Sequence, residues 1–128
     1  MIVVDSSALV IAALEESPRG ARVRDAVLEG AIAPHVIDAE VGQGLRKMVL
    51  RGELEAEPGL RALRSARRLV TRRLSHGPLL ARAWELRENV SFYDALYVAL
   101  AEARQLPLLT ADTRLEGAAG TRCAFELV

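Results

Sequence analysis

The stretch from Ser91 to Ala101 constrains the fold more than any other part of the chain, because its side chains are apolar on almost every side. A helix of this kind is buried inside a layered fold, since it has no polar face to turn toward water. It nevertheless carries Asp94 in its first turn. Ser91 and Asp94 have the capping-box spacing, which gives the acid a structural role. Alternatively, the helix N-terminus keeps a site carboxylate ionised and ready for a cation.

The length and composition indicate one packed domain spanning residues 1–128, because 51% of the 128 residues are hydrophobic. Seventeen acids balance seventeen bases, so no overall field attracts nucleic acid and any such binding must be local. The single cysteine excludes an internal disulfide. The chain begins without a basic leader and contains no apolar run of membrane-spanning length. We therefore expect a soluble cytoplasmic protein with no membrane partner.

Short β-branched or apolar runs alternate with helical patterns along the whole chain. Strands are expected over residues 1–4, 31–33, 69–74, 107–110 and 122–127, the last of them at a sheet edge. Helices are expected over residues 8–14, 18–30, 36–51, 54–68, 78–88 and 91–101, with Ser6 or Ser7 capping the first. This alternation predicts an α/β fold, a three-layer α/β/α sandwich with a mainly parallel central sheet.

Four acids from distant parts of the chain are predicted to meet at one edge of that sheet. Asp5 ends the first strand and Asp112 follows the fourth, while Glu40 and Asp94 lie in the first turns of helices that begin at the same edge. Ligands of open parallel sheets bind beyond the carboxyl ends of the strands. The sequence therefore indicates a site built from carboxylates.

Converging carboxylates repel one another unless some are protonated or a cation neutralises them. An all-oxygen donor set suits Mg²⁺ or Mn²⁺. Phosphodiester hydrolysis is the chemistry that such a cluster performs best, with one ion activating water and a second stabilising the leaving oxygen. Ser6 and Thr110 are expected to support the carboxylates or an ordered water by hydrogen bonds, although helix capping explains Ser6 equally well.

Arginines supply the candidate contacts to phosphate. Arg61, Arg64, Arg68 and Arg72 form a stripe along one side if helical geometry continues that far, and the strand expected over residues 69–74 would break it. Such a stripe is either a solvated face or a local phosphate-binding surface. Arg72 and Arg73 are candidates for positioning RNA phosphates, because the planar guanidinium can bind two oxygens at once. Asp38 is assigned a structural role in the first turn of its helix.

The sequence resembles the PIN-domain ribonucleases, in particular the VapC-type toxins of bacterial toxin–antitoxin pairs. Four segments carry the resemblance, in family-like order and separation: Ile2 to Leu9, Asp38 to Val41, Tyr93 to Ala101, and Leu109 to Asp112. The resemblance implies a Mg²⁺- or Mn²⁺-dependent endoribonuclease. It also implies a homodimer and inhibition by a VapB-type antitoxin, a small protein whose tail enters the active-site groove.

The family's acidic site maps onto Asp5, Glu40, Asp94 and Asp112. We expect the first three to bind the principal metal directly or through water, and Asp112 to help to hold a second metal or orient the attacking water. The sequence departs from its relatives at Gly42 and Gly44, which weaken the helix that carries Glu40.

Two other functions fit parts of this pattern. A receiver-type signalling domain also places acids at the edge of a parallel sheet, but it needs adjacent acids after the first strand, and here Asp5 is followed by Ser6 and Ser7. A PIN fold that has lost catalysis and serves only as a binding module is the other alternative. The intact set of four acids argues against it.

Overall fold

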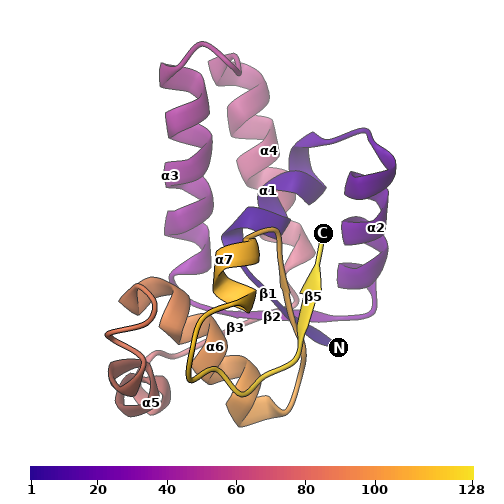
Figure 1. Cartoon of the computed structure of the whole chain (residues 1–128). Coiled ribbons are helices and arrows are strands. Elements are labelled where there is room, and N and C mark those ends of the chain that lie inside the picture. Colours follow the sequence, from indigo (N-terminus) through magenta and orange to yellow (C-terminus); the bar gives the residue numbers. More distant parts are fainter.

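A five-stranded parallel sheet forms the centre of the computed structural model, which describes all residues 1–128 (Figure 1). The strand order is β3-β2-β1-β4-β5, and every neighbouring pair is parallel. The strands are β1 (Ile2–Val4), β2 (Ala31–Pro34), β3 (Arg72–Leu74), β4 (Leu108–Thr110) and β5 (Phe125–Leu127). Because all five run in one direction, their carboxyl ends share one edge, and the predicted fold class is confirmed.

Helices cover both faces of this sheet. They are α1 (Ser6–Leu14), α2 (Pro18–Leu28), α3 (Ile37–Leu50), α4 (Ala56–Leu69), the single 3-10 turn η1 (Gly77–Leu79), α5 (Leu80–Glu85), α6 (Phe92–Arg104) and α7 (Thr113–Glu116). Helices α1, α2 and α4 pack together on one face, whereas α6 packs on the other face with α5 outside it. The result is a three-layer α/β/α arrangement.

Helices α3 and α4 form an antiparallel hairpin that extends beyond the sheet (Figure 1). Gly52 lies in the turn after α3 with φ of 75°, a left-handed conformation that glycine adopts without strain. The predicted end of this helix at residue 51 with Gly52 as its terminator is therefore confirmed. The structure also confirms Pro18 in the first turn of α2, where Ser17 caps the helix.

Several predicted boundaries were wrong. The strand expected over residues 69–74 begins only at Arg72, because α4 continues to Leu69. The expected helix over residues 78–88 is a 3-10 turn followed by α5, which ends at Glu85, because Leu86 turns back into the core and is 1% exposed. Trp84 lies on the outer side of α5 and is 61% exposed, so it is not a core residue. The last strand is also shorter than expected and begins at Phe125.

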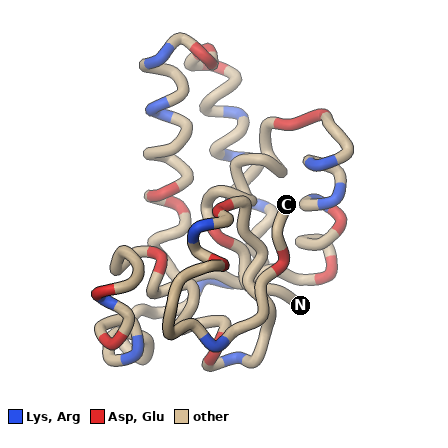
Figure 2. The backbone as a smooth tube through the Cα atoms, viewed as in Figure 1, with Lys and Arg blue, Asp and Glu red and all other residues tan.

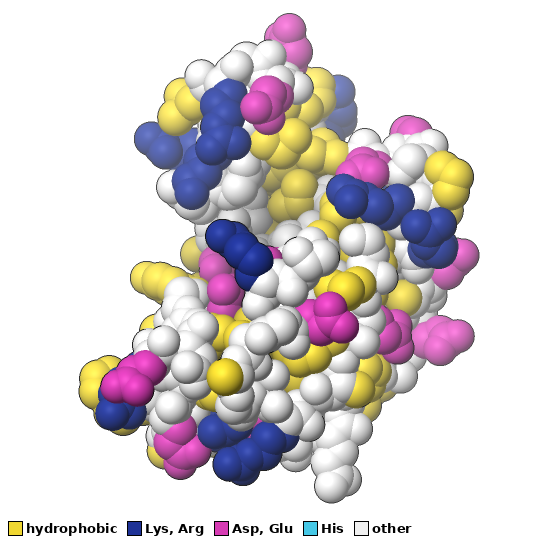
Figure 3. All heavy atoms as spheres, in the orientation of Figure 1, with side chains coloured by type: hydrophobic (Ala, Val, Ile, Leu, Met, Phe, Trp, Pro, Cys, Tyr) yellow, Lys and Arg dark blue, Asp and Glu magenta, His cyan; other side chains and the backbone are white.

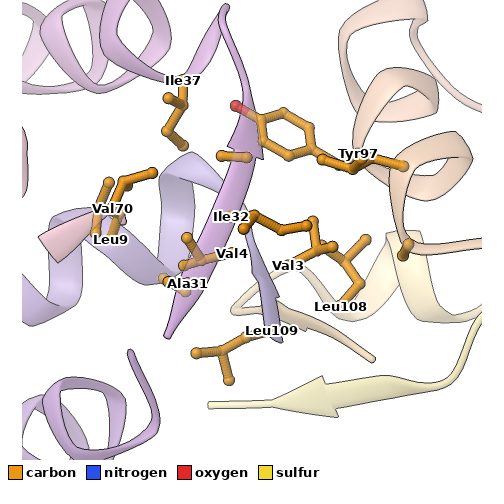
Figure 4. Packing of buried hydrophobic residues seen from close by; sticks show 14 of the residues in the cluster. Val3, Val4, Leu9, Ala31, Ile32, Ile37, Val70, Tyr97, Leu108 and Leu109 are labelled. Carbon is orange, nitrogen blue, oxygen red and sulfur yellow. The ribbon is translucent and has the colours of Figure 1, made fainter. Parts of the chain in front are cut away.

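The core is almost entirely aliphatic and lies between the sheet and its two helical layers (Figure 4). Every residue of α6 from Ala95 to Ala101 is buried, as its composition predicts. Tyr97 is the largest fully buried side chain, and Figure 4 shows its ring against the central strands with the hydroxyl at the margin of the cluster. None of the helices combines the length and the hydropathy that crossing a bilayer requires.

Candidate active site

Asp5 lies at the carboxyl end of β1 and is only 4% exposed. Its Oδ1 accepts hydrogen bonds from the Ala8 backbone N–H at 3.0 Å and from the Ser7 hydroxyl at 2.6 Å. Its Oδ2 accepts from the Thr110 hydroxyl at 2.5 Å. Burial raises the pKa of Asp5, as does the nearby charge of Asp94, although these three hydrogen bonds oppose the change.

The residue that caps α1 is Asp5, and neither Ser6 nor Ser7 does so. The hydroxyl beside Asp5 belongs to Ser7, whereas Ser6 makes no side-chain hydrogen bond, so the expected supporting role passes from Ser6 to its neighbour. The reason is that α1 begins at Ser6, so both serines lie inside its first turn and Asp5 takes the N-cap position. Ser7 also accepts from the Ala111 backbone N–H at 3.0 Å, which ties α1 to the loop after β4.

Thr110 connects two of the acids, as expected of a supporting residue. Its hydroxyl donates to Asp5 and accepts from the Asp112 backbone N–H at 3.0 Å. Thr110 is fully buried, and it is the only buried polar residue in the protein besides Asp5. The ends of β1 and β4 are therefore held in a fixed relation by a side chain at the base of the site.

Glu40 lies in the first turn of α3 and accepts a hydrogen bond at 2.5 Å from the Tyr97 hydroxyl of α6. Burial raises the pKa of Glu40, the Tyr97 hydrogen bond lowers it, and the charges of Asp94 and Asp5 raise it again. Sequence reasoning missed Tyr97. The available signal was the single polar group in the otherwise apolar run from Ala95 to Ala101, because a buried tyrosine hydroxyl usually has a partner.

Asp94 lies in the first turn of α6, after the N-cap residue Ser91. Its backbone N–H donates to the Ser91 hydroxyl at 3.1 Å, so the expected N-cap is present. Its carboxylate also faces the other acids. Burial raises the pKa of Asp94, the Ser91 side chain beside the carboxylate lowers it, the charge of Asp112 raises it and the charge of Arg114 lowers it.

Asp112 caps the short helix α7 by accepting from the Arg114 backbone N–H at 2.9 Å. It lines a hollow together with Asp94, and the remaining lining residues are Asn89, Val90, Ser91, Arg114 and Leu115. Figure 2 shows acidic positions from separate parts of the chain gathered around α7.

The structure thus brings all four predicted acids to the carboxyl edge of the sheet. The negative charge of Asp94 raises the pKa of Asp5 and of Glu40. The charge of Asp5 also raises the pKa of Glu40, and the charge of Asp112 raises that of Asp94. The carboxylates therefore repel one another. No three Asp, Glu, His or Cys side chains stand in positions to share one ion in this arrangement. The acids face one another without closing into a ligand cage.

The two arginines predicted to contact RNA lie elsewhere. Arg73 is committed to Asp38, with Nε to Oδ2 at 2.5 Å and Nη2 to Oδ1 at 2.8 Å, and it also donates to two backbone carbonyls. This ion pair holds the pKa of Asp38 below its usual range. Arg72 lines a different hollow with Arg104, at the end of α6 opposite Asp94. The basic residue beside the acids is Arg114, which sequence reasoning did not select.

This combination of a parallel three-layer fold and four acids at its carboxyl edge is that of a PIN domain. The family model described as "PIN domain" matches residues 2–120. The chain is 46% identical over 129 residues to Ribonuclease VapC1 of Mycobacterium tuberculosis, with 98% of this chain and 96% of the relative covered. The chain therefore belongs to the PIN-domain family, among the VapC ribonucleases.

Two solved structures share the fold. PAE2754 from Pyrobaculum aerophilum matches with a TM-score of 0.73 and 28% identity, covering 97% of this chain and 81% of that one. VapBC2 from Rickettsia felis, crystallised with a DNA fragment from its promoter, matches with a TM-score of 0.73 and 14% identity, covering 100% and 99%. At that identity the second match shows the fold alone.

Proposed function

We propose that this protein is a Mg²⁺- or Mn²⁺-dependent endoribonuclease and the toxin of a VapBC-type toxin–antitoxin pair. The observation that carries the proposal is the convergence of Asp5, Glu40, Asp94 and Asp112, three of which have raised pKa values because they are partly desolvated and repel one another. Keeping four acids close together is electrostatically unfavourable, and this arrangement indicates a cationic ligand. The name of the relatives supplies the reaction class, cleavage of RNA.

The donor set fits a hard divalent cation, since it consists of carboxylate oxygens with no sulfur or imidazole among them. Asp5, Glu40 and Asp94 would hold the principal ion, and Asp112 would hold a second ion or orient water. When bound, such an ion neutralises the carboxylates and activates water for attack on a phosphodiester. Small movements of the side chains would bring the acids to one ion, because the carboxylates do not form a closed cage.

The hydroxyls of Ser7, Thr110 and Tyr97 orient these carboxylates before any ligand arrives. Each donates to one oxygen of an acid, at distances of 2.6, 2.5 and 2.5 Å. Such partners fix the rotamer of the ligating side chain and account for much of the affinity and activity of metal sites. The residues of this chain therefore hold the acids in position and shield them from water on the core side.

Cleavage of a total RNA pool tests this function. Purified protein free of antitoxin is incubated with Mg²⁺ or Mn²⁺, or with chelator, and the new 5′ ends are mapped. Glu40→Gln removes one site charge with little change of volume, and Glu16→Gln is the matched control on an exposed acid outside the site. We expect discrete cuts from the wild type and from Glu16→Gln, and none from Glu40→Gln or with chelator.

Other results would point to the alternatives. Metal-independent cleavage that survives Glu40→Gln would indicate a contaminating nuclease and would contradict the assignment of the acids. RNA binding without cleavage, by a folded and metal-loaded protein, would favour the catalytically inactive binding module.

The antitoxin is proposed to bind across the α3–α4 hairpin. Apolar side chains line a hollow between these helices, and Leu50 and Leu60 are 68% and 44% exposed. Figure 3 shows hydrophobic side chains gathered over this part of the molecule, above the face that carries the acids. Co-expression with a neighbouring VapB-type gene product tests the pairing, because Leu60→Asp should weaken the complex without changing the activity of the free toxin.

A homodimer is proposed from the family resemblance and from Trp84, which is 61% exposed and has the Arg87 guanidinium over its ring at 5.1 Å from the centroid. Sedimentation of the wild type and Trp84→Ser tests it. A monomeric wild type at micromolar concentration would contradict this part of the proposal.

A further inference from the structure

Arg114 lies on the rim of the acidic site, in a position that the capping of α7 determines. It is the second residue of α7, and its backbone N–H donates to Asp112 Oδ1 at 2.9 Å. Asp94, Asp112 and Arg114 line one hollow, in which Arg114 is the only basic residue. The side chain of Arg114 is 92% exposed and therefore reaches into solvent beside the carboxylates.

The guanidinium of Arg114 is largely unused by the protein. Its single side-chain contact runs from Nε to Asp112 Oδ1 at 3.4 Å, longer than the 2.7–2.9 Å typical of a charge-assisted hydrogen bond. Neither terminal nitrogen donates to any protein group. By contrast, Arg73 and Arg82 each bind a carboxylate through two nitrogens and also donate to backbone carbonyls.

Such an exposed ion pair contributes little to the stability of the fold. A structural role alone therefore does not account for an arginine at this position. The two terminal nitrogens of the Arg114 guanidinium instead have the geometry to donate to two oxygens of a phosphate.

The electrostatics of the site require such a group. RNA is a polyanion, and the four carboxylates repel it even where a cation neutralises part of their charge. The two bases first predicted to help lie elsewhere, with Arg73 paired to Asp38 and Arg72 near the far end of α6. Arg114 alone combines proximity to Asp94 with an uncommitted guanidinium, and its charge acts on the Asp94 carboxylate.

We propose that Arg114 binds a backbone phosphate of the RNA at or next to the bond that is cut. This inference rests on the proposed ribonuclease function and adds one substrate-binding residue to it. A contact of this kind reads no base, so it sets affinity and the register of the RNA across the acids. Sequence preference must come from other contacts.

The experiment compares Arg114→Gln and Arg114→Lys with Arg22→Gln, which removes an exposed arginine of α2 that makes no side-chain hydrogen bond. The RNA is the substrate that total-RNA cleavage by the wild type identifies. Each change is also placed in the Glu40→Gln background, so that Kd can be measured without cleavage over a range of salt concentrations. Melting temperatures are recorded for every variant.

We expect Arg114→Gln to raise Kd and KM about tenfold. It should also reduce the slope of log Kd against log salt by about 1, the effect of losing one phosphate contact. Arg114→Lys should retain the salt slope but recover only part of the affinity, because lysine keeps the charge without the fork. Arg22→Gln should match the parent protein, and no variant should shift the melting temperature appreciably.

An unchanged Kd and salt slope in Arg114→Gln, with a wild type that cleaves, would overturn the role of Arg114 and leave the nuclease assignment intact. A fall in kcat alone, or a loss of activity that follows a lowered melting temperature, would also overturn it, since either result would place the effect in Asp112 and α7. A wild type that neither binds nor cuts RNA would overturn the proposed function itself.

Discussion

Replacing Tyr97 by phenylalanine removes one oxygen atom from the core and one hydrogen bond from the candidate active site. The Tyr97 ring is fully buried and its hydroxyl donates to Glu40 Oε1 at 2.5 Å. The phenylalanine ring occupies the same space, so no large cavity forms. The measured effect therefore reports the loss of one donor to a partly buried carboxylate.

The expected cost follows from the charge of the acceptor. A hydrogen bond to an ionised group contributes about 1.5–3 kcal/mol, against about 1 kcal/mol for a neutral pair. We expect Tyr97→Phe to lower the free energy of unfolding by about 2 kcal/mol at pH 7.5. For a chain of 128 residues this corresponds to a melting temperature lower by about 7 °C.

The pH dependence provides a second check. Burial raises the pKa of Glu40 above its ordinary 4.5, and the Tyr97 hydrogen bond counteracts that rise. Tyr97→Phe therefore raises the pKa of Glu40 further. Stability that depends on an ionised Glu40 is present above these raised values and is lost as the pH falls through them. The difference between wild type and Tyr97→Phe should shrink between neutral pH and about pH 4.5.

Thermal and urea denaturation of metal-free protein measure both quantities. Tyr93→Phe is the matched control, because Tyr93 lies one turn earlier on α6 and is 59% exposed. It should leave stability unchanged. Equal melting temperatures for wild type and Tyr97→Phe at pH 7.5, or a difference that grows toward acid pH, would refute the assignment of Tyr97 as the donor that holds an ionised Glu40.

Three further outcomes are expected. Asp94→Asn should stabilise the metal-free protein at pH 7, because the pKa of Asp94 is raised, and this gain in stability should disappear as the pH falls toward 3.8. With metal at a hundred times its Kd, the wild type should instead gain about 2.7 kcal/mol of stability. Thermal melts with and without metal should show that the order of stability reverses. Gly42→Ala should stabilise the protein by about 1 kcal/mol in urea denaturation, since a Cβ there meets nothing within 4 Å; a destabilised variant would mean that the glycine serves a close approach. Thr110→Val should cost about 2 kcal/mol by removing a donor to Asp5, and a neutral effect in the same assay would show that this contact is dispensable.

The elements that form the site were predictable because local rules determine them. The short β-branched and apolar runs and the helix periodicity locate the strands and helices, and parallel pairing then carries the ends of β1 and β4 to one edge. Asp5, Glu40, Asp94 and Asp112 could be selected on those grounds alone. The prediction of buried α6 succeeded for the same reason, since its composition leaves no face for water.

The contacts that position those acids could not be predicted. The Tyr97–Glu40 hydrogen bond joins residues 57 positions apart, and it depends on how α6 packs against the start of α3. The choice of Ser7 over Ser6 depends on the residue at which α1 begins. Arg73 was predicted to contact RNA, but it binds Asp38, which lies 35 positions away in the chain. The packing of β3 against α3 determines this pair, and the sequence alone does not show that packing.

The capping of α1 by Asp5 has a consequence for how this acid can serve as a ligand. A carboxylate offers about four lone-pair positions, and Ser7, Ala8 and Thr110 already occupy three of those on Asp5. One position, on Oδ2, is left for a cation. Asp5 is thereby restricted to monodentate coordination of a cation, and any bidentate coordination must come from the other acids. In the proposed metal site the coordination number would then depend on Glu40, Asp94 and Asp112, and exchanging those acids between Asp and Glu would be the way to alter it.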